Sequence, residues 1–289
     1  MMNMPSHFNS SLFQKRKRQN LFGLTISMIA MAIGMFFLFW ILSVLFIKGF
    51  SAISIDTFIQ STPGPGSEGG GLANAIVGSL MLVFFCTIIG TPIGILAGIY
   101  LSEYGKKNLM AEVTRFVIDI MLSAPSIVIG LFVYAFVIAP GKHFSGWAGS
   151  LALALIAIPV VVRTTENMLS LVPIRLREAA FALGAPKWKV NLQVTLKAAQ
   201  SGVITGVLLA VARVSGETAP LLFTALNNQF FSWKMNGPMA NLPMVIFQFA
   251  LSPYDNWVDL AWVGALLITC TVLGLNITAR IFLRDKSKR

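Results

Sequence analysis

The chain has 289 residues, of which 56% are apolar and only 11% are charged, and its mean hydropathy is +0.76. A soluble globular domain carries about 25% charged residues, so this composition excludes a disordered chain, a fibrous chain and an ordinary cytosolic enzyme. The net charge of +11 comes from basic residues that lie between apolar runs, which favours a membrane protein over a nucleic-acid-binding protein.

Six apolar stretches are long enough to cross a bilayer, because each helical span needs roughly 20 apolar residues. In chain order, the predicted spans cover residues 21–47, 73–101, 114–139, 147–171, 199–226 and 257–282. We therefore expect an all-α integral membrane protein with a single transmembrane domain over residues 21–283. A basic segment (residues 1–20) precedes this domain, and a basic tail (residues 284–289) follows it.

Most Lys and Arg residues fall on one side of these six spans. This side holds Lys15, Arg16, Lys17, Arg18, Lys106, Lys107, Arg115, Arg175, Arg177, Lys187, Lys189, Lys197, Arg280, Arg284, Lys286, Lys288 and Arg289, against Lys48, Lys142 and Lys234 on the other. By the positive-inside rule the basic side is cytoplasmic. Both termini are therefore expected in the cytoplasm.

Two of the predicted outer loops have unusual compositions. Residues 63–71 are rich in Gly and Pro, which predicts an exposed linker without a helix or strand. Residues 227–256 contain the apolar run 244–251, which is too short to cross a bilayer. We expect this run to form a re-entrant or surface-lying helix.

The loop between the fourth and fifth spans, residues 173–198, contains several local structural signals. Pro173 suits the start of a helix, Gly184 fits the left-handed position that ends one, and Pro186 can open the next helix, which leads into the fifth span. Basic residues surround an apolar group made of Leu176, Phe181, Leu183 and Trp188. This pattern is typical of a docking element for a groove, and a polar connector on the membrane surface is the alternative.

The order of residues in this loop resembles the EAA loop of ABC importer permeases. The resemblance rests on Glu178-Ala179-Ala180 followed by Gly184, while Lys197 stands where the family pattern has a proline. It implies that residues 173–198, here named the coupling loop, dock on an ATPase subunit. The coupling residues implied in this way are Arg177, Glu178, Ala179, Ala180, Gly184 and Lys187.

Three further stretches, residues 124–131, 159–169 and 212–222, resemble the PstA-type phosphate permeases of the binding-protein-dependent ABC importer family. This resemblance implies the type I ABC importer permease fold, with six membrane helices, in the bacterial plasma membrane. It also implies a PstC-like sister permease as heterodimer partner, two PstB-like ATPase subunits on the cytoplasmic side and a PstS-like phosphate-binding protein outside. No cofactor is expected in this chain, because ATP and Mg²⁺ would bind to the ATPase subunits.

Several ionisable residues lie inside the predicted spans, where a charge costs about 2.5–3.5 kcal/mol. Arg213 and Glu217 are four residues apart and are expected on one face of the fifth span. Arg163 lies in the fourth span, three residues before Glu166. A guanidinium offers a fixed fork of donors to an oxyanion, so Arg213, Glu217 and Arg163 are the candidate substrate path. The alternative is that they form structural ion pairs. Asp119 is expected to be a partner for a basic residue at a helix end.

Other functions remain open or are disfavoured by the sequence. The chain contains no Gly-x-x-x-x-Gly-Lys-Ser/Thr phosphate loop, so ATP would have to be hydrolysed by a separate subunit. It also shows no His-Glu-x-x-His motif or other catalytic constellation, and no spacing typical of metal ligands. A permease of the same fold for another oxyanion and a stand-alone secondary transporter remain as alternatives; the latter would usually show inverted repeats.

Overall fold

The computed structural model describes the backbone of residues 10–67, 69–105 and 108–286. It also describes the side chains of these residues, except those of residues 10, 11 and 279–286. Parts of the predicted basic segment 1–20 and of the tail 284–289 therefore lie outside the described residues. The chain divides into two compact units, residues 1–48 and 49–289. Helix α1 (Ser10–Ser51) makes up the first unit almost entirely. At 1.5 Å per residue its 42 residues exceed the roughly 30 Å of bilayer hydrocarbon, so it extends beyond a single crossing.

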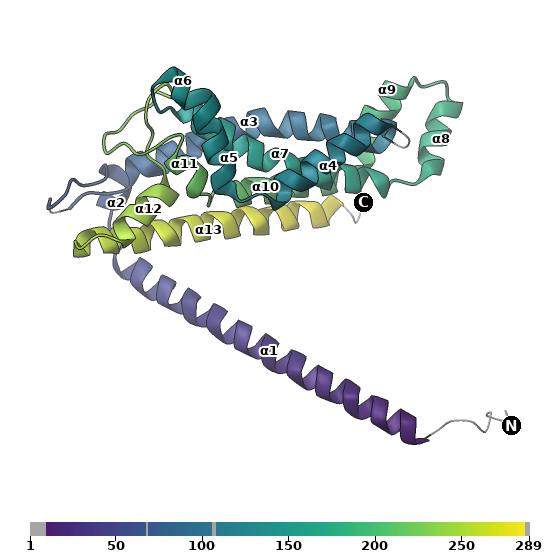
Figure 1. Ribbon diagram of the computed structural model, residues 1–289, viewed down its shortest axis with the longest axis horizontal. Coiled ribbons are helices and arrows are strands. Elements are labelled where there is room, and N and C mark those ends of the chain that lie inside the picture. Colours follow the sequence, from purple (N-terminus) through teal and green to yellow (C-terminus); the bar gives the residue numbers. More distant parts are fainter. Residues whose placement is uncertain (1–9, 68, 106–107, 287–289) are drawn as a thin grey trace. The chain divides into compact units, whose positions relative to one another are not determined.

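The second unit is built from helices alone over the residues that the structure describes. They are α2 (Asp56–Ile59), α3 (Ala73–Tyr104), α4 (Leu109–Ser123), α5 (Ser126–Val133), the π-helix η1 (Tyr134–Ile138), α6 (Ala139–Gly141), α7 (Gly146–Ser170), α8 (Ile174–Ala182), α9 (Lys187–Lys189), the π-helix η2 (Val190–Thr195), α10 (Leu196–Val214), α11 (Ala219–Leu222), α12 (Leu242–Ala250) and α13 (Asp255–Lys286). Figure 1 shows α3, α7, α10 and α13 running side by side, with α8 and α9 at one end of this bundle.

In the described chain, five helical segments are long and apolar enough to cross a membrane, and a bent helix pair raises this number to six. This result confirms the all-α membrane fold that the sequence predicts. The bounds of the second, fourth and sixth spans agree with the prediction to within four residues. The orientation of the termini stays a prediction.

The third span is not the continuous helix that the sequence predicts over residues 114–139. Two helical segments replace it, α4 and the continuous run Ser126–Gly141 made of α5, η1 and α6, and they meet at an angle of 107°. The break lies at Ala124 and Pro125, whose ψ angles of 137° and 134° are extended. Proline disfavours the helical conformation in the residue before it, so Ala124 leaves the helix and α4 ends at Ser123.

The fifth span is also displaced from its predicted position over residues 199–226. The helical segment begins at Lys187, which confirms that the second loop helix leads into this span, and it ends at Val214. A turn then precedes α11, where Pro220 occupies the second helical position. Glu217 therefore lies in this turn and not on the helix that carries Arg213, so the expectation that both residues share one helix face is wrong.

Helices α3 and α7 pack closely against each other through glycine residues. Gly90, Gly94 and Gly98 recur every four residues on the face of α3 that meets α7. A Cβ atom at Gly94 would lie 2.7 Å from the Val161 Cβ, and one at Gly98 would lie 2.6 Å from the Thr165 Cβ. Small residues of this spacing let two membrane helices approach closely, so α3 and α7 are in close contact along this face.

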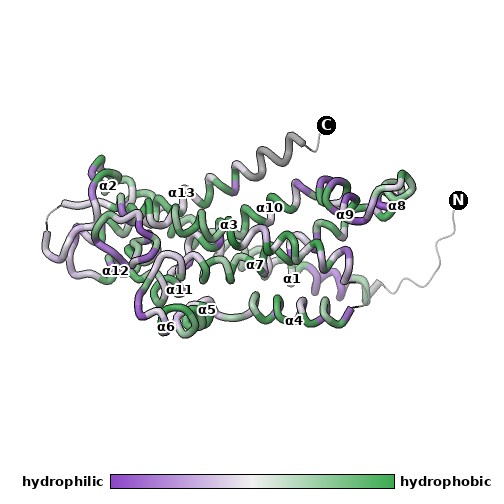
Figure 2. The backbone as a smooth tube through the Cα atoms, turned by 90° about the horizontal axis from the view of Figure 1, so that it is seen from above, coloured by the Kyte–Doolittle hydropathy of each residue, from purple (hydrophilic) through white to green (hydrophobic). Residues whose placement is uncertain are grey.

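The end of the bundle opposite α8 and α9 consists of loops fixed by buried polar side chains. Asn74 is 4% exposed, and its amide group donates to the Asn228 carbonyl at 2.8 Å and to the Thr62 hydroxyl at 2.9 Å. The apolar run that the sequence singles out forms α12, which begins at an Asn241 cap and buries one face, while Phe247 is 50% exposed; whether it is re-entrant or lies on the membrane surface stays a prediction. Figure 2 shows hydrophilic residues gathered at the two ends of the bundle and hydrophobic ones between them.

Candidate functional site

The coupling loop adopts the helix–turn–helix conformation that its sequence predicts. Helix α8 ends in a Schellman motif: the Ala185 N–H donates to the Ala180 carbonyl at 3.2 Å, and the Gly184 N–H donates to the Phe181 carbonyl at 2.9 Å. Gly184 itself has φ of +77°, which is costly for any residue with a Cβ atom. Pro186 then directly precedes α9.

Large apolar side chains on the coupling loop are left exposed in the single chain. Leu183 is 88% exposed, Trp188 is 56% exposed and Phe181 is 46% exposed. Glu178 and Ala179, which like Phe181 belong to α8, are exposed as well. The coupling loop therefore presents large apolar side chains that no other part of the described chain covers.

Two basic residues of the coupling loop point back to the chain instead of outward. The Arg177 Nη1 atom lies 3.1 Å from Oε1 of Glu103, and these side chains are only 13% and 8% exposed. Arg177 also donates from Nη2 to the Leu169 carbonyl at 2.6 Å. The Lys187 ammonium lies 3.8 Å from the centre of the Tyr104 ring, within the range of a cation–π interaction.

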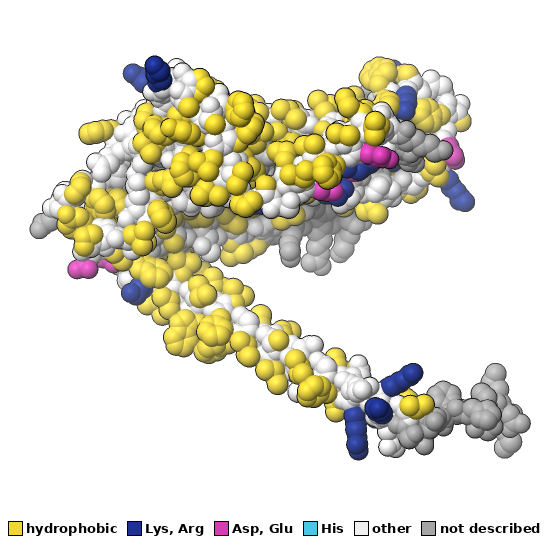
Figure 3. Space-filling view, viewed as in Figure 1, with side chains coloured by type: hydrophobic (Ala, Val, Ile, Leu, Met, Phe, Trp, Pro, Cys, Tyr) yellow, Lys and Arg dark blue, Asp and Glu magenta, His cyan; other side chains and the backbone are white. Residues whose placement is uncertain are grey.

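Four charged side chains form one network between α3, α4 and α7. Glu166 accepts a hydrogen bond from Arg115 Nε at 2.7 Å and lies 3.6 Å from Arg163. Arg163 in turn donates to Asp119 at 2.6 Å, and Arg115 also donates to the Leu101 carbonyl at the end of α3. Two cations face two anions, so the network is electrically balanced. Figure 3 shows basic and acidic side chains close together beside α4 on an otherwise apolar surface.

Arg213 and Glu217 form a second, looser pair where α10 ends. Their closest charged atoms, Nε and Oε1, are 3.9 Å apart, which is too far for a hydrogen bond. The Arg213 side chain is 47% exposed in the single chain, while that of Glu217 is 17% exposed. Among the described residues the Arg213 side chain has no hydrogen-bond partner, whereas that of Arg163 donates to Asp119.

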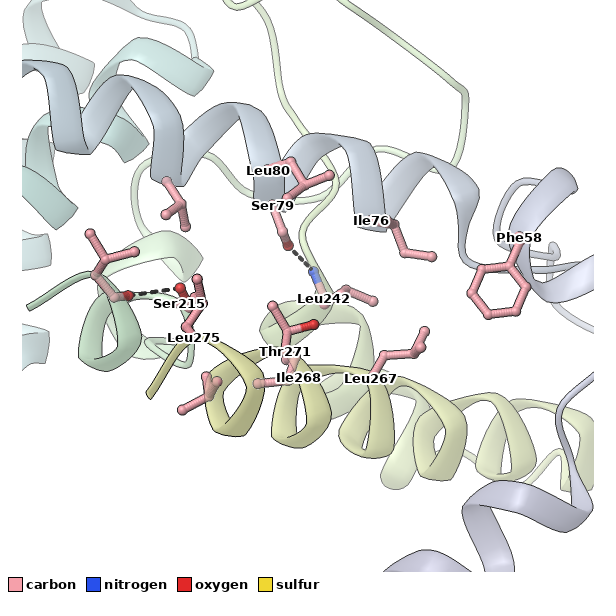
Figure 4. Close-up of a pocket in the computed structure, with 13 residues that line it drawn as sticks. Phe58, Ile76, Ser79, Leu80, Ser215, Leu242, Leu267, Ile268, Thr271 and Leu275 are labelled. Carbon is pink, nitrogen blue, oxygen red and sulfur yellow. Dashed lines mark hydrogen bonds between the residues drawn. The ribbon is translucent and has the colours of Figure 1, made fainter. Parts of the chain in front are cut away.

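An apolar cavity of about 180 Å³ lies between α3, α10, α12 and α13. Ile76, Leu267 and Ile268 are among its lining residues, and the Ser79 hydroxyl accepts a hydrogen bond from the Leu242 N–H (Figure 4). Among the residues that the structure describes, no charged side chain lines this cavity. An apolar cavity of this kind is unsuited to an anion, so the charged side chains described above are not part of a binding site in this cavity.

Residues 90–285 match the model of a family described as the binding-protein-dependent transport system inner membrane component. The chain belongs to this family. The permease is 59% identical to the phosphate transport system permease protein PstA of Pasteurella multocida, over 96% of this chain and 98% of that protein. It is 60% identical to the PstA protein of Haemophilus influenzae, over 95% of this chain and 97% of that protein.

A solved structure of the same fold is the methionine ABC transporter MetNI in inward-facing conformations. Its matching chain is 21% identical to the permease, with a TM-score of 0.57, and the match covers 74% of this chain and 94% of that one. This similarity confirms the type I ABC importer permease fold that the resemblance implied.

The structure brings some of the predicted site residues of the permease together and separates others. Arg163 lies in the balanced network, whereas Arg213 and Glu217 form their own pair at the end of α10. Asp119 does have a basic partner, although this partner is Arg163 within the fourth span. Sequence reasoning did not single out Glu103. A lone acid in the last turn of a long apolar helix was its only signal, and its partner in the coupling loop becomes visible only in the fold.

Proposed function

We propose that this chain is a membrane-spanning permease subunit of an ABC importer that moves inorganic phosphate into a bacterial cell across the plasma membrane. The supporting observation is the identity of about 60% with two proteins named PstA along nearly the whole chain. ATP, with Mg²⁺, is hydrolysed on a separate pair of ATPase subunits. A PstC-like permease completes the membrane part as a heterodimer, and a PstS-like protein delivers phosphate from outside.

The coupling loop is the part of the chain that meets the ATPase subunits. The exposed Phe181, Leu183 and Trp188 side chains supply apolar area for a groove, and Glu178 and Ala179 lie exposed beside them. Gly184 sets the angle between the two loop helices through its positive φ. Arg177 and Lys187 act from the other side of the loop and fix it to the permease.

The anion passes Arg213, the half-exposed guanidinium at the end of α10. An arginine stays protonated at every physiological pH and matches phosphate oxygens with two parallel donors. Glu217, at 3.9 Å, balances the charge when phosphate is absent and keeps the anion from binding too tightly to leave. Arg163 is a weaker candidate for this path because Asp119 and Glu166 already balance its charge.

Phosphate import by the reconstituted complex tests this proposal. The permease, its sister permease, the ATPase and the binding protein are placed in liposomes, and uptake of labelled phosphate is measured with and without ATP. We expect uptake only with all four components and ATP. Competition by sulfate, molybdate and arsenate separates phosphate import from import of another oxyanion. Uptake without the ATPase would favour a stand-alone secondary transporter and overturn the proposal.

A further inference from the structure

Two adjacent residues at the end of α3, Glu103 and Tyr104, contact both helices of the coupling loop. The Glu103 carboxylate faces Arg177 on α8. The Tyr104 ring lies beneath the ammonium of Lys187, the first residue of α9, and its hydroxyl lies 3.3 Å from the Asn191 amide nitrogen in η2. A single helix end therefore supports the coupling loop on both sides of its Gly184 turn.

The same support extends to α7. Besides facing Glu103, Arg177 donates to the carbonyl of Leu169, in the last turn of α7. Since α3 and α7 are packed tightly through their glycine face, the coupling loop is tied to a helix pair and not to one flexible end. The Glu103 and Arg177 side chains are nearly excluded from water, so separating the two charges is costly, although Glu103 Oε1 has no hydrogen-bond partner among the described residues.

The covalent connection from α9 to α10 is of a different kind. It runs through η2, a six-residue π-helix. Within it the buried Asn191 Oδ1 and Thr195 Oγ1 atoms have no hydrogen-bond partner among the described residues. Segments of π-helix are rare and frequently occur at functional sites, so η2 is a second, covalent link between the loop and the membrane helices.

We propose that Glu103 and Tyr104 are positioning residues that transmit movement of the coupling loop to the α3–α7 pair. When a bound ATPase displaces the loop, these two residues move α3 and α7 with it. This inference rests on the proposed function, because it assigns a task to the support of the same docking element. It predicts that coupling can be lost while docking survives.

The first test is Glu103→Gln in the reconstituted complex, with phosphate imported per ATP hydrolysed as the readout. We expect the complex to assemble and to hydrolyse ATP, and phosphate import per ATP to fall about 5-fold or more. The matched control is Glu112→Gln, which removes an exposed acid on the neighbouring helix α4 and should leave the ratio unchanged. An unchanged ratio in assembled Glu103→Gln complexes overturns the inference.

A pair of Tyr104 variants provides an independent test that does not leave a buried charge unpaired. Tyr104→Phe keeps the ring beneath Lys187 and loses only the hydroxyl, whereas Tyr104→Leu loses both contacts. We expect the Phe variant to import nearly as much phosphate per ATP as the parent and the Leu variant to import several-fold less. If Glu103→Gln complexes fail to assemble, the two Tyr104 variants provide the deciding test. A Tyr104→Leu complex that assembles and imports as much phosphate per ATP as the parent overturns the inference. A failure of the proposed function is distinct, because the parent complex itself would then import no phosphate.

Discussion

Replacing Gly184 should weaken docking of the ATPase in proportion to the strain at its positive φ. Gly184 has φ of +77°, and no atom lies within 4 Å of the position where a Cβ would be built. The cost of a side chain is therefore conformational strain and not a clash. A left-handed conformation costs an L-residue roughly 1–2 kcal/mol, more for a β-branched residue and less for asparagine.

Each 1.4 kcal/mol corresponds to a tenfold change in an equilibrium constant, so Gly184→Ala should weaken ATPase binding about 5- to 30-fold. Gly184→Asn should bind more tightly than the Ala variant, and Gly184→Val should bind worst. The assay is binding of the purified ATPase to the permease pair in nanodiscs, together with phosphate uptake. Membrane insertion should be normal, because the change lies outside the apolar spans.

Gly64→Val is the matched control for this series. Gly64 also has open space around its Cβ position, and its φ lies outside the left-handed region. The same valine there should leave ATPase binding at the parent level. Two results would refute the reasoning. In the first, Gly184→Val binds and stimulates the ATPase as the parent does. In the second, Gly184→Asn binds as weakly as Gly184→Val, because the size of the side chain and not the φ angle would then be decisive.

Three further predictions concern the charges and the orientation. Arg213→Gln should reduce phosphate uptake severely in complexes that assemble normally, and Arg213→Lys should fail nearly as badly if the guanidinium fork matters; uptake at the parent rate would make the pair structural. Glu166→Gln should lower the thermal stability of the complex more than Asp119→Asn, because Glu166 is 13% exposed and faces two arginines, whereas Asp119 is 51% exposed; equal losses in a thermal melt would contradict this ranking. In a cysteine-free background, an impermeant thiol reagent should label a cysteine at Ser67 but not one at Ser287 in intact cells, and the reverse would invert the predicted orientation.

Local signals in the sequence were sufficient for most of the helices and for the coupling loop. The composition requires membrane spans, because apolar runs of this length are stable only when buried in lipid or protein. The loop conformation follows from Gly184 and Pro186, whose preferences are properties of single residues and do not depend on distant partners. This is why the turn between α8 and α9 could be placed from the sequence.

The helix breaks and the charge partners were decided only by the tertiary structure. Pro125 and Pro220 lie in apolar runs, and a proline in such a run can either bend a membrane helix or end it, depending on what packs against it. Arg115 and Glu166 are 51 residues apart, and so their pairing depends on how α4 packs against α7. The sequence by itself therefore determined the membrane class, most spans and the loop, because these follow from local composition. Where the spans break and which charges meet depend on long-range packing, which only the fold provides.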